Sequence, residues 1–183
     1  QRQMCIRDRL RGMIGIVPQK AVLFKGTIRH NMQWRDKNAT DEDIWNALDI
    51  AQAKDFVEKK PDKLDEMILQ EGKNLSGGQR QRLTIARALV GDPEILILDD
   101  SASALDLATD ARLRKAIHEK TSGMTVFIVS QRISSIKSAD KIIVLDDGKI
   151  AGIGTHSELY KGCEVYKEIC LSQLSEKEAQ ANG

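Results

Sequence analysis

Apolar residues along this chain follow two different spacings, and each change of spacing marks the start of another expected element. Short continuous apolar runs between polar segments predict buried strands at 13–17, 94–98, 124–129 and 141–145. Elsewhere apolar residues return every three or four positions, which predicts helices at 27–32, 40–51, 55–60, 76–90, 105–120, 133–138 and from 155 to about 174. Strands that alternate with helices indicate an α/β domain with a mainly parallel sheet.

Residues that favour turns and helix ends stand at the expected boundaries. Thr40 can cap the helix that follows it, and the acidic residues after Thr40 suit the positive end of a helix dipole. The segment Thr155–Glu158 has the capping-box pattern. Asp147–Gly148 has the residue types of a two-residue hairpin turn, so the strand at 141–145 should pair with a return strand at 149–153.

The two ends of the chain differ from its middle. Residues 1–9 show neither a helical nor a strand period, and Met4–Arg9 resembles a translated DNA adapter of the kind used in sequencing libraries. We therefore expect non-native sequence at 1–9. Residues 175–183 carry too little apolar surface to order themselves, so we expect a flexible tail after a domain that spans 10–174.

Composition and charge exclude several classes of function. The net charge is +1 and only 4% of the residues are aromatic, so we expect no nucleic-acid partner. No run approaches the ~18 apolar residues that a membrane span requires. The three cysteines form no C-x-x-C pair and the histidines are scattered, so neither a disulfide framework nor a cysteine–histidine metal site is expected.

The segment Ser76–Gln79 is the sharpest chemical signal. Its two glycines follow a serine that can cap the helix, and they leave backbone N–H groups bare at the helix N-terminus. Such a terminus binds phosphate through free N–H donors and through the helix dipole. The alternative interpretation of these residues taken alone is a capped turn with no ligand.

A second signal follows about twenty residues later. The apolar strand 94–98 ends in two carboxylates, Asp99 and Asp100. In parallel sheets of this kind, Mg²⁺ and nucleotide bind at the carboxyl ends of the strands. A strand followed by a polar turn is the alternative, and the combination of the two signals favours a nucleotide site.

In their order and spacing, these segments resemble the ATP-binding-cassette (ABC) family. The signature motif corresponds to Leu75–Arg82, the Walker B strand to Ile95–Asp100, the D-loop to Ser101–Asp106, the Q-loop to Val17–Gln19 and the switch segment to Ile128–Arg132. The stretch Val22–Ile28 is similar to the exporter branch in particular. The resemblance covers Leu10 to about Leu174.

The resemblance implies part of a P-loop NTPase-like ABC cassette. Its parts would be a mainly parallel sheet, a helical subdomain at about 27–90 and a C-terminal hairpin. The phosphate-binding Walker A string G-x-x-x-x-G-K-[ST] does not occur in the sequence. Nor does the aromatic residue that stacks on adenine in the family. We expect both upstream of Leu10, with the first strands of the core.

The resemblance also implies ATP and Mg²⁺ as ligands and gives the site residues their roles. Gln19 and Asp99 would hold Mg²⁺, while Gln19, Asp100 and Gln131 would act on the attacking water and the γ-phosphate. The residues expected to contact ATP across a dimer of two such domains are Ser76, Gly77, Gly78, Gln79 and Asp106.

Two of these residues depart from the family pattern. Asp100 stands where the family usually has Glu, and its carboxylate is withdrawn by roughly 1.5 Å. Gln131 stands where the family usually has His, and a glutamine carries no positive charge and relays no proton. Both changes predict slow hydrolysis in the chain's own site, as in the degenerate half of heterodimeric exporters. An active homodimer that tolerates both residues is the alternative.

The implied function is that of an exporter's ATPase subunit at the cytoplasmic face of the plasma membrane. Its partners would be a second nucleotide-binding domain and a transmembrane domain within the same full-length chain, and the present fragment alone would be inactive. One alternative is a soluble ABC-type ATPase acting on DNA or ribosomes, which the near-neutral charge and the Val22–Ile28 stretch disfavour. Another is a domain that holds ATP as a clamp with little turnover.

Overall fold

A computed structural model describes residues 2–101, 104–121 and 123–181. The chain divides into two compact units, Gln1–Val129 and Ser130–Gly183, and each unit is described by itself. No helix within the described ranges is both long enough and apolar enough to cross a lipid bilayer.

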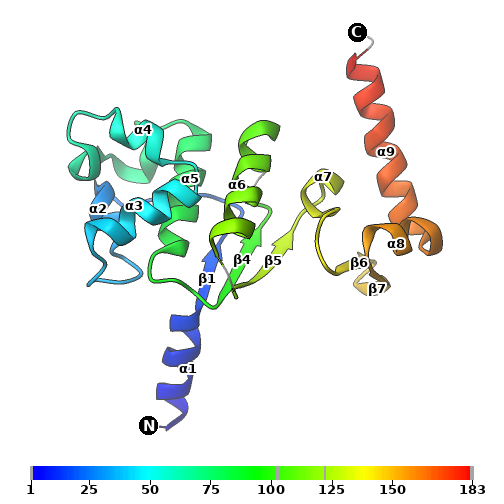
Figure 1. Ribbon diagram of the computed structural model, residues 1–183, viewed down its shortest axis with the longest axis horizontal. Helices are drawn as coiled ribbons and strands as arrows, with labels where there is room; N and C mark the ends of the chain where they lie inside the picture. Colours follow the sequence, from blue (N-terminus) through cyan, green and yellow to red (C-terminus); the bar gives the residue numbers. More distant parts are fainter. Residues whose placement is uncertain (1, 102–103, 122, 182–183) are drawn as a thin grey trace. The chain divides into compact units, whose positions relative to one another are not determined.

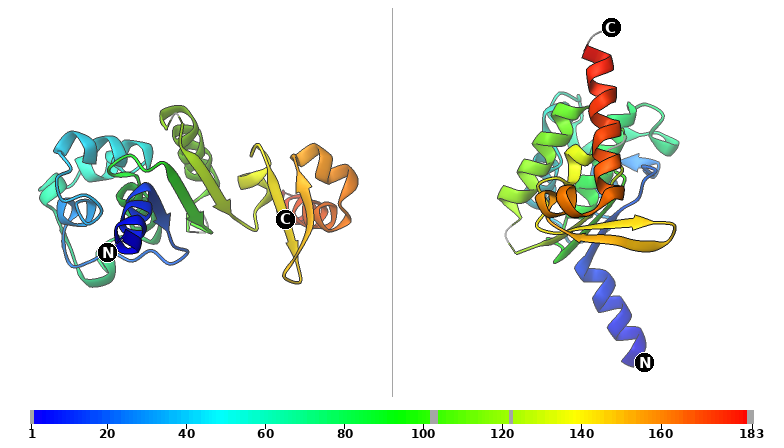
Figure 2. Two further views of the ribbon diagram at one scale, coloured as in Figure 1. Left: turned by 90° about the horizontal axis from the view of Figure 1, so that it is seen from below. Right: turned by 90° about the vertical axis from the view of Figure 1, so that its right-hand side faces the viewer.

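The first unit is built on a parallel sheet of the strands β1 (Ile14–Val17), β4 (Ile95–Asp99) and β5 (Thr125–Val129). The central strand is β4, which pairs in parallel with β1 on one side and with β5 on the other (Figures 1 and 2). Each of these strands coincides with an apolar run from which a strand was predicted, so the predicted α/β class with a parallel sheet is confirmed.

One face of this sheet is covered by the helices α5 (Gly77–Leu89) and α6 (Leu107–Lys120). Leu96 and Leu98 of β4 point into this core and are almost fully buried. Gly15 of β1 lies so close to α5 that an added Cβ would stand 2.5 Å from the carbonyl oxygen of Ala88. The sequence therefore needs glycine here for helix and strand to approach one another.

Short elements between β1 and α5 form the predicted helical region. These are β2 (Gly26–Thr27), α2 (Ile28–Met32), α3 (Asp41–Ile50), α4 (Lys54–Glu58), the 3-10 turns η1 (Lys63–Asp65) and η2 (Gln70–Gly72), and β3 (Met67–Ile68), which pairs antiparallel with β2. Thr27 caps α2, and Thr40 and Asp43 form a capping box at the start of α3. The cap that the sequence predicts at Thr40 is confirmed, and the structure adds a cap at Thr27 that was not predicted.

The second unit holds α7 (Ile133–Ile136), the antiparallel hairpin β6 (Ile142–Asp146) and β7 (Lys149–Gly154), α8 (His156–Gly162) and α9 (Glu164–Ala181). Asp147 and Gly148 both adopt positive φ angles, 45° and 72°, as the predicted two-residue hairpin turn requires. The apolar core of this unit lies between the hairpin and the helices α8 and α9, around the buried ring of Tyr166.

Three boundaries differ from the sequence-based expectations. The helix expected from 155 to about 174 is two helices, because Cys163 adopts an extended backbone between α8 and α9. Helix α9 also runs on to Ala181, through most of the stretch expected to be a flexible tail. At the other end, α1 (Arg2–Met13) is helical although residues 1–9 show no helical period, since arginine, glutamine and methionine favour helix without an apolar face.

Candidate functional site

The start of α5 carries the glycine-rich segment, and its serine and glutamine cap each other. The Ser76 hydroxyl oxygen accepts the backbone N–H of Gln79 at 3.2 Å, and the Gln79 side-chain oxygen accepts the backbone N–H of Ser76 at 3.0 Å. This capping box fixes the turn by bonds within the segment itself. The hydroxyl hydrogen of Ser76 is left to donate elsewhere.

The two glycines between them face open space. Apart from its chain neighbours and the backbone of α5 itself, a Cβ added at Gly77 would meet no atom within 4 Å, and one added at Gly78 would make only an ordinary contact, 3.5 Å from the oxygen of Ala104. The fold of the chain itself therefore does not demand glycine at position 77. An exposed helix start with this much room suits a ligand that approaches the backbone N–H groups closely.

Gln19 and Asp100 come together at the carboxyl ends of β1 and β4. The Gln19 side-chain nitrogen donates to a carboxylate oxygen of Asp100 at 3.2 Å, although the two residues are 81 positions apart. Asp99 is the last residue of β4, directly before Asp100 in the chain, and is exposed. The parallel register, with Val17 opposite Leu98, is what brings these three side chains to one sheet edge.

The backbone at Asp100 is unusual. Its φ angle is +42°, in the left-handed region that aspartate tolerates better than most side chains. Its N–H donates to the carbonyl oxygen of Val129 at 2.9 Å, which ties the turn after β4 to the end of β5. The carboxylate is thus held near Gln19 by backbone geometry as well as by its own hydrogen bond.

Asp106 caps helix α6. Its carboxylate accepts the backbone N–H of Thr109 at 2.9 Å, and hydrogen bonds from that N–H and from the Thr109 hydroxyl hold the pKa of Asp106 below its ordinary value. The residue lies at the end of the predicted D-loop, of which positions 102 and 103 fall outside the described residues. Its carboxylate therefore has a structural role within the chain.

Gln131 belongs to the second unit and lies two residues before the start of α7. Its side chain is exposed, and its backbone carbonyl oxygen accepts a hydrogen bond of 2.6 Å from the side-chain nitrogen of Gln173 on α9. Gln173 was not among the predicted site residues. No motif or spacing in the sequence indicates a bond between residues 42 positions apart.

The donor set at the sheet edge fits a magnesium ion. Two carboxylates and the amide oxygen of Gln19 are the hard oxygen ligands that Mg²⁺ prefers, and this ion usually keeps several water or phosphate ligands as well. Among the residues that the structure describes, no group of three or more His, Cys, Asp or Glu side chains could hold a metal by itself. Asp99 and Gln19 would hold such an ion only together with ligands from outside the chain, with the carboxylate of Asp100 beside Gln19.

These features together are the layout of a nucleotide-binding α/β domain, with acidic strand ends and a glycine-rich helix start. The profile of the ABC transporter family matches residues 2–103, more than half of the chain. The chain belongs to the ABC transporter family.

Known proteins extend the match over nearly the whole chain. It is 45% identical to an uncharacterized ABC transporter ATP-binding protein of Bacillus subtilis, YfiB, over 94% of the chain and 30% of that protein. It is also 45% identical to a probable multidrug resistance ABC transporter ATP-binding/permease protein of the same species, YheI, over 88% of the chain and 28% of that protein.

A solved structure has the same fold. The structure of a bacterial Atm1-family ABC exporter with ATP bound superposes with a TM-score of 0.87 at 35% identity, over 92% of this chain and 30% of that one. The predicted cassette fold is therefore confirmed. The chain spans about three tenths of the length of the proteins that it matches.

Proposed function

We propose that this chain is part of the ATP-binding subunit of an ABC exporter, which couples ATP binding and hydrolysis to transport across the membrane. The names of the similar proteins support this, since they include a probable multidrug resistance transporter and an Atm1-family exporter. The observation that carries the proposal is the helix start of α5, which is fully capped yet open at Gly77.

In this proposal, Ser76–Gln79 serves a nucleotide that is bound by a second nucleotide-binding domain. The bare N–H groups at Gly77 and Gly78 and the dipole of α5 would stabilise the γ-phosphate, and the Ser76 hydroxyl would donate to it. Asp106 would contact the same nucleotide from the D-loop. A second domain could approach this helix start because no other element of the unit lies against Gly77.

The chain's own strand ends form the slow site of the pair. Asp99 and Gln19 would bind Mg²⁺, which when present neutralises phosphate charge. Asp100 accepts a hydrogen bond from Gln19, but its carboxylate is too short by one methylene to reach the water that a glutamate would orient. Gln131 can bind a γ-phosphate oxygen but cannot relay a proton. We infer that this site holds ATP and hydrolyses it slowly.

The proposed transmembrane partner contacts the loop after Gln19. In this loop the ring of Phe24 stacks on Trp34, with centroids 4.4 Å apart, and the two side chains are 39% and 58% exposed. In this proposal the stacked pair of rings would be part of the surface that the transmembrane domain covers. The domain would then lie at the cytoplasmic face of the plasma membrane, and the 183-residue chain would be inactive alone because it has no Walker A string.

The test compares the complete protein with and without its partner. We expect ATP hydrolysis by the purified pair to exceed that of the complete protein alone many-fold, since only the partner's site is competent. Equal activity alone and in the pair would refute the heterodimer and the weakened site together.

A further inference from the structure

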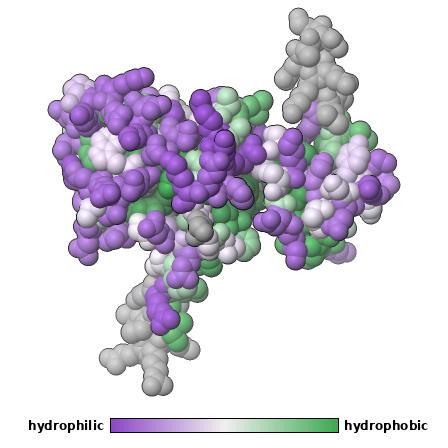
Figure 3. Space-filling view, in the orientation of Figure 1, coloured by the Kyte–Doolittle hydropathy of each residue, from purple (hydrophilic) through white to green (hydrophobic). Residues whose placement is uncertain are grey.

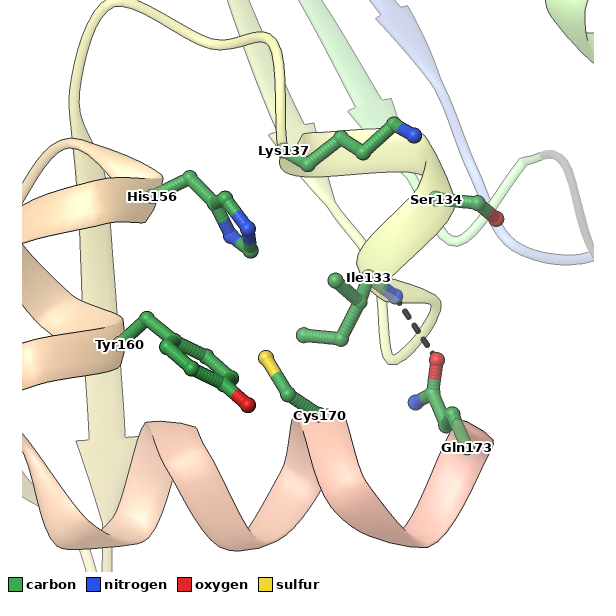
Figure 4. Close-up of a pocket in the computed structure, with 7 residues that line it drawn as sticks. All are labelled: Ile133, Ser134, Lys137, His156, Tyr160, Cys170 and Gln173. Atoms are coloured by element: carbon green, nitrogen blue, oxygen red, sulfur yellow. Dashed lines mark hydrogen bonds between the residues drawn. The ribbon is translucent and has the colours of Figure 1, made fainter. Parts of the chain in front are cut away.

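One side chain ties the switch segment, defined here as Ser130–Ile133, to the C-terminal helix. The side-chain nitrogen of Gln173 donates to the carbonyl oxygen of Gln131 at 2.6 Å, and its side-chain oxygen accepts the N–H of Ile133 at 2.9 Å. Figure 4 shows the second of these bonds, which reaches from α9 to the first residue of α7. We call this pair of hydrogen bonds the Gln173 bridge.

Together, the two hydrogen bonds of the bridge require the amide group of a glutamine side chain. A backbone carbonyl needs a donor and a backbone N–H needs an acceptor, and a primary amide offers one of each in a single plane. If the amide were turned over, oxygen would face oxygen and N–H would face N–H. A leucine at this position makes neither bond, and a carboxylate makes only the one to Ile133.

The bridge also supplies a cap that α7 does not have locally. Ile133 is the first residue of α7, and the N-cap Arg132 makes no side-chain hydrogen bond to the helix. The first N–H groups of a helix have no partner within it, and here the N–H of Ile133 is satisfied from α9. Within the segment, the Ser130 hydroxyl oxygen accepts the N–H of Arg132 at 3.0 Å. The backbone of the switch segment is therefore hydrogen-bonded at three consecutive residues, Gln131, Arg132 and Ile133.

A cavity of about 320 Å³ lies between α7, α8 and α9, and Ile133, Cys170 and Gln173 are among the residues that line it (Figure 4). Ile133 also packs against the apolar core of this unit, which includes Tyr166 and Cys170 of α9, and the two hydrogen bonds add a directional polar attachment to that packing. The side chain of Gln131 remains exposed while its backbone is held.

We propose that Gln173 is a positioning residue, which fixes through the backbone of Gln131 where that side chain is presented to nucleotide. This inference rests on the proposed function, since Gln131 is the switch residue only in an ABC-type site. The bridge makes α9 part of the site's geometry although α9 carries no residue of the family's motifs. A misplacement of about 1 Å at such a group can cost on the order of 100-fold in rate.

The experiment uses nuclear magnetic resonance on the 183-residue chain without nucleotide. In Gln173→Leu, we expect hydrogen exchange at the Ile133 amide to accelerate about five-fold, the equivalent of one lost hydrogen bond. The carbonyl ¹³C resonance of Gln131 should shift and its backbone order should fall. In Gln173→Glu, the Ile133 amide should stay protected while the Gln131 carbonyl still shifts.

In Gln173→Glu, the bridge predicts a change at the Gln131 carbonyl without a change at the Ile133 amide. A general loss of packing would change both of these groups. Glu168→Gln on the same helix is the control and should change neither. The inference is overturned if Ile133 and Gln131 respond to neither substitution, or respond together in Gln173→Glu. If Gln173→Leu also loses protection at distant amides such as Leu83, the chain as a whole has been destabilised. The result with Gln173→Glu then tests the bridge instead. No step uses ATP, so failure of the proposed function would appear only in the hydrolysis experiment above.

Discussion

At the scale of single residues, the fold requires glycine at position 15 but not at position 77, where we propose that a ligand of the partner domain requires it. An added Cβ would collide with the backbone of α5 at Gly15 but would meet nothing at Gly77. We expect Gly77→Ala to leave the chain folded and to raise its free energy of unfolding by up to about 1 kcal/mol, since alanine favours helix over glycine. Gly15→Ala should lower it by about 1–3 kcal/mol through overpacking.

Thermal and denaturant unfolding of the two variants measures this difference. If Gly77→Ala destabilised the chain as strongly as Gly15→Ala, the glycine would have a role inside the fold. The argument for an external ligand at this position would then lose its support.

At the scale of the element, the caps of α3, α6 and α8 make the fold sensitive to acid. Hydrogen bonds from the helix starts hold the pKa values of Asp43, Asp106 and Glu158 below their ordinary ranges. A carboxyl group whose pKa is lower folded than unfolded stabilises the fold above its unfolded pKa. That contribution disappears as pH falls through the folded value.

Asp106→Asn tests this for one helix. Asparagine caps as well as aspartate, so we expect the melting temperature at pH 7 to change little. Below the ordinary aspartate pKa of 3.8, the variant should lose less stability with falling pH than the parent chain does. Parallel melting curves for the two proteins between pH 7 and pH 3 would contradict the role of this cap in acid sensitivity.

Elements whose signals are local could be predicted from the sequence, and elements set by tertiary contacts could not. The Thr40 cap of α3, the capping box at Thr155–Glu158 and the hairpin turn at Asp147–Gly148 are encoded within a few residues, and all three predictions are confirmed. Gln19 and Asp100 were assigned to one site only by the resemblance to the ABC family, and the structure places their side chains within hydrogen-bond distance of each other. The roles of Asp100 and Gln131 in hydrolysis stay predictions.

The features that the sequence did not predict depend mostly on contacts between distant parts of the chain. Helix α8 ends where the buried Cys163 packs against Gly152 of the hairpin, a contact that leaves no mark on the helical period. The Gln173 bridge joins residues 40 and 42 positions apart, in one α-helix whose neighbouring residues give no hint of it. Helix α1 forms without the apolar stripe on which the prediction relied.

At the scale of the whole molecule, the sheet of the first unit has one bare face. Ile16, Phe127 and Val129 are 60%, 53% and 55% exposed, and Ile16 and Phe127 flank Ile97 in a single row across the strands. Figure 3 shows apolar residues at the surface in this region. Parallel sheets are ordinarily covered on both faces, so we expect another apolar surface to cover this face.

We expect the chain to self-associate through that face at micromolar concentrations. Phe127→Thr combined with Val129→Thr keeps residues that favour strands but removes apolar area, so it should shift the chain toward monomer in sedimentation velocity. Leu171→Gln, an equally exposed apolar position on α9, is the matched control and should have no effect. Association that persists unchanged in the double variant would place the contact elsewhere.

The central claim is that this chain lends its signature motif to a partner's competent site while its own site turns over slowly. The most direct test measures ATP hydrolysis by the complete protein paired with its partner, with either Gly77→Ala or Asp100→Asn in this subunit. The account predicts that Gly77→Ala removes most of the activity and that Asp100→Asn leaves most of it. Loss of activity in Asp100→Asn, with activity retained in Gly77→Ala, would contradict it.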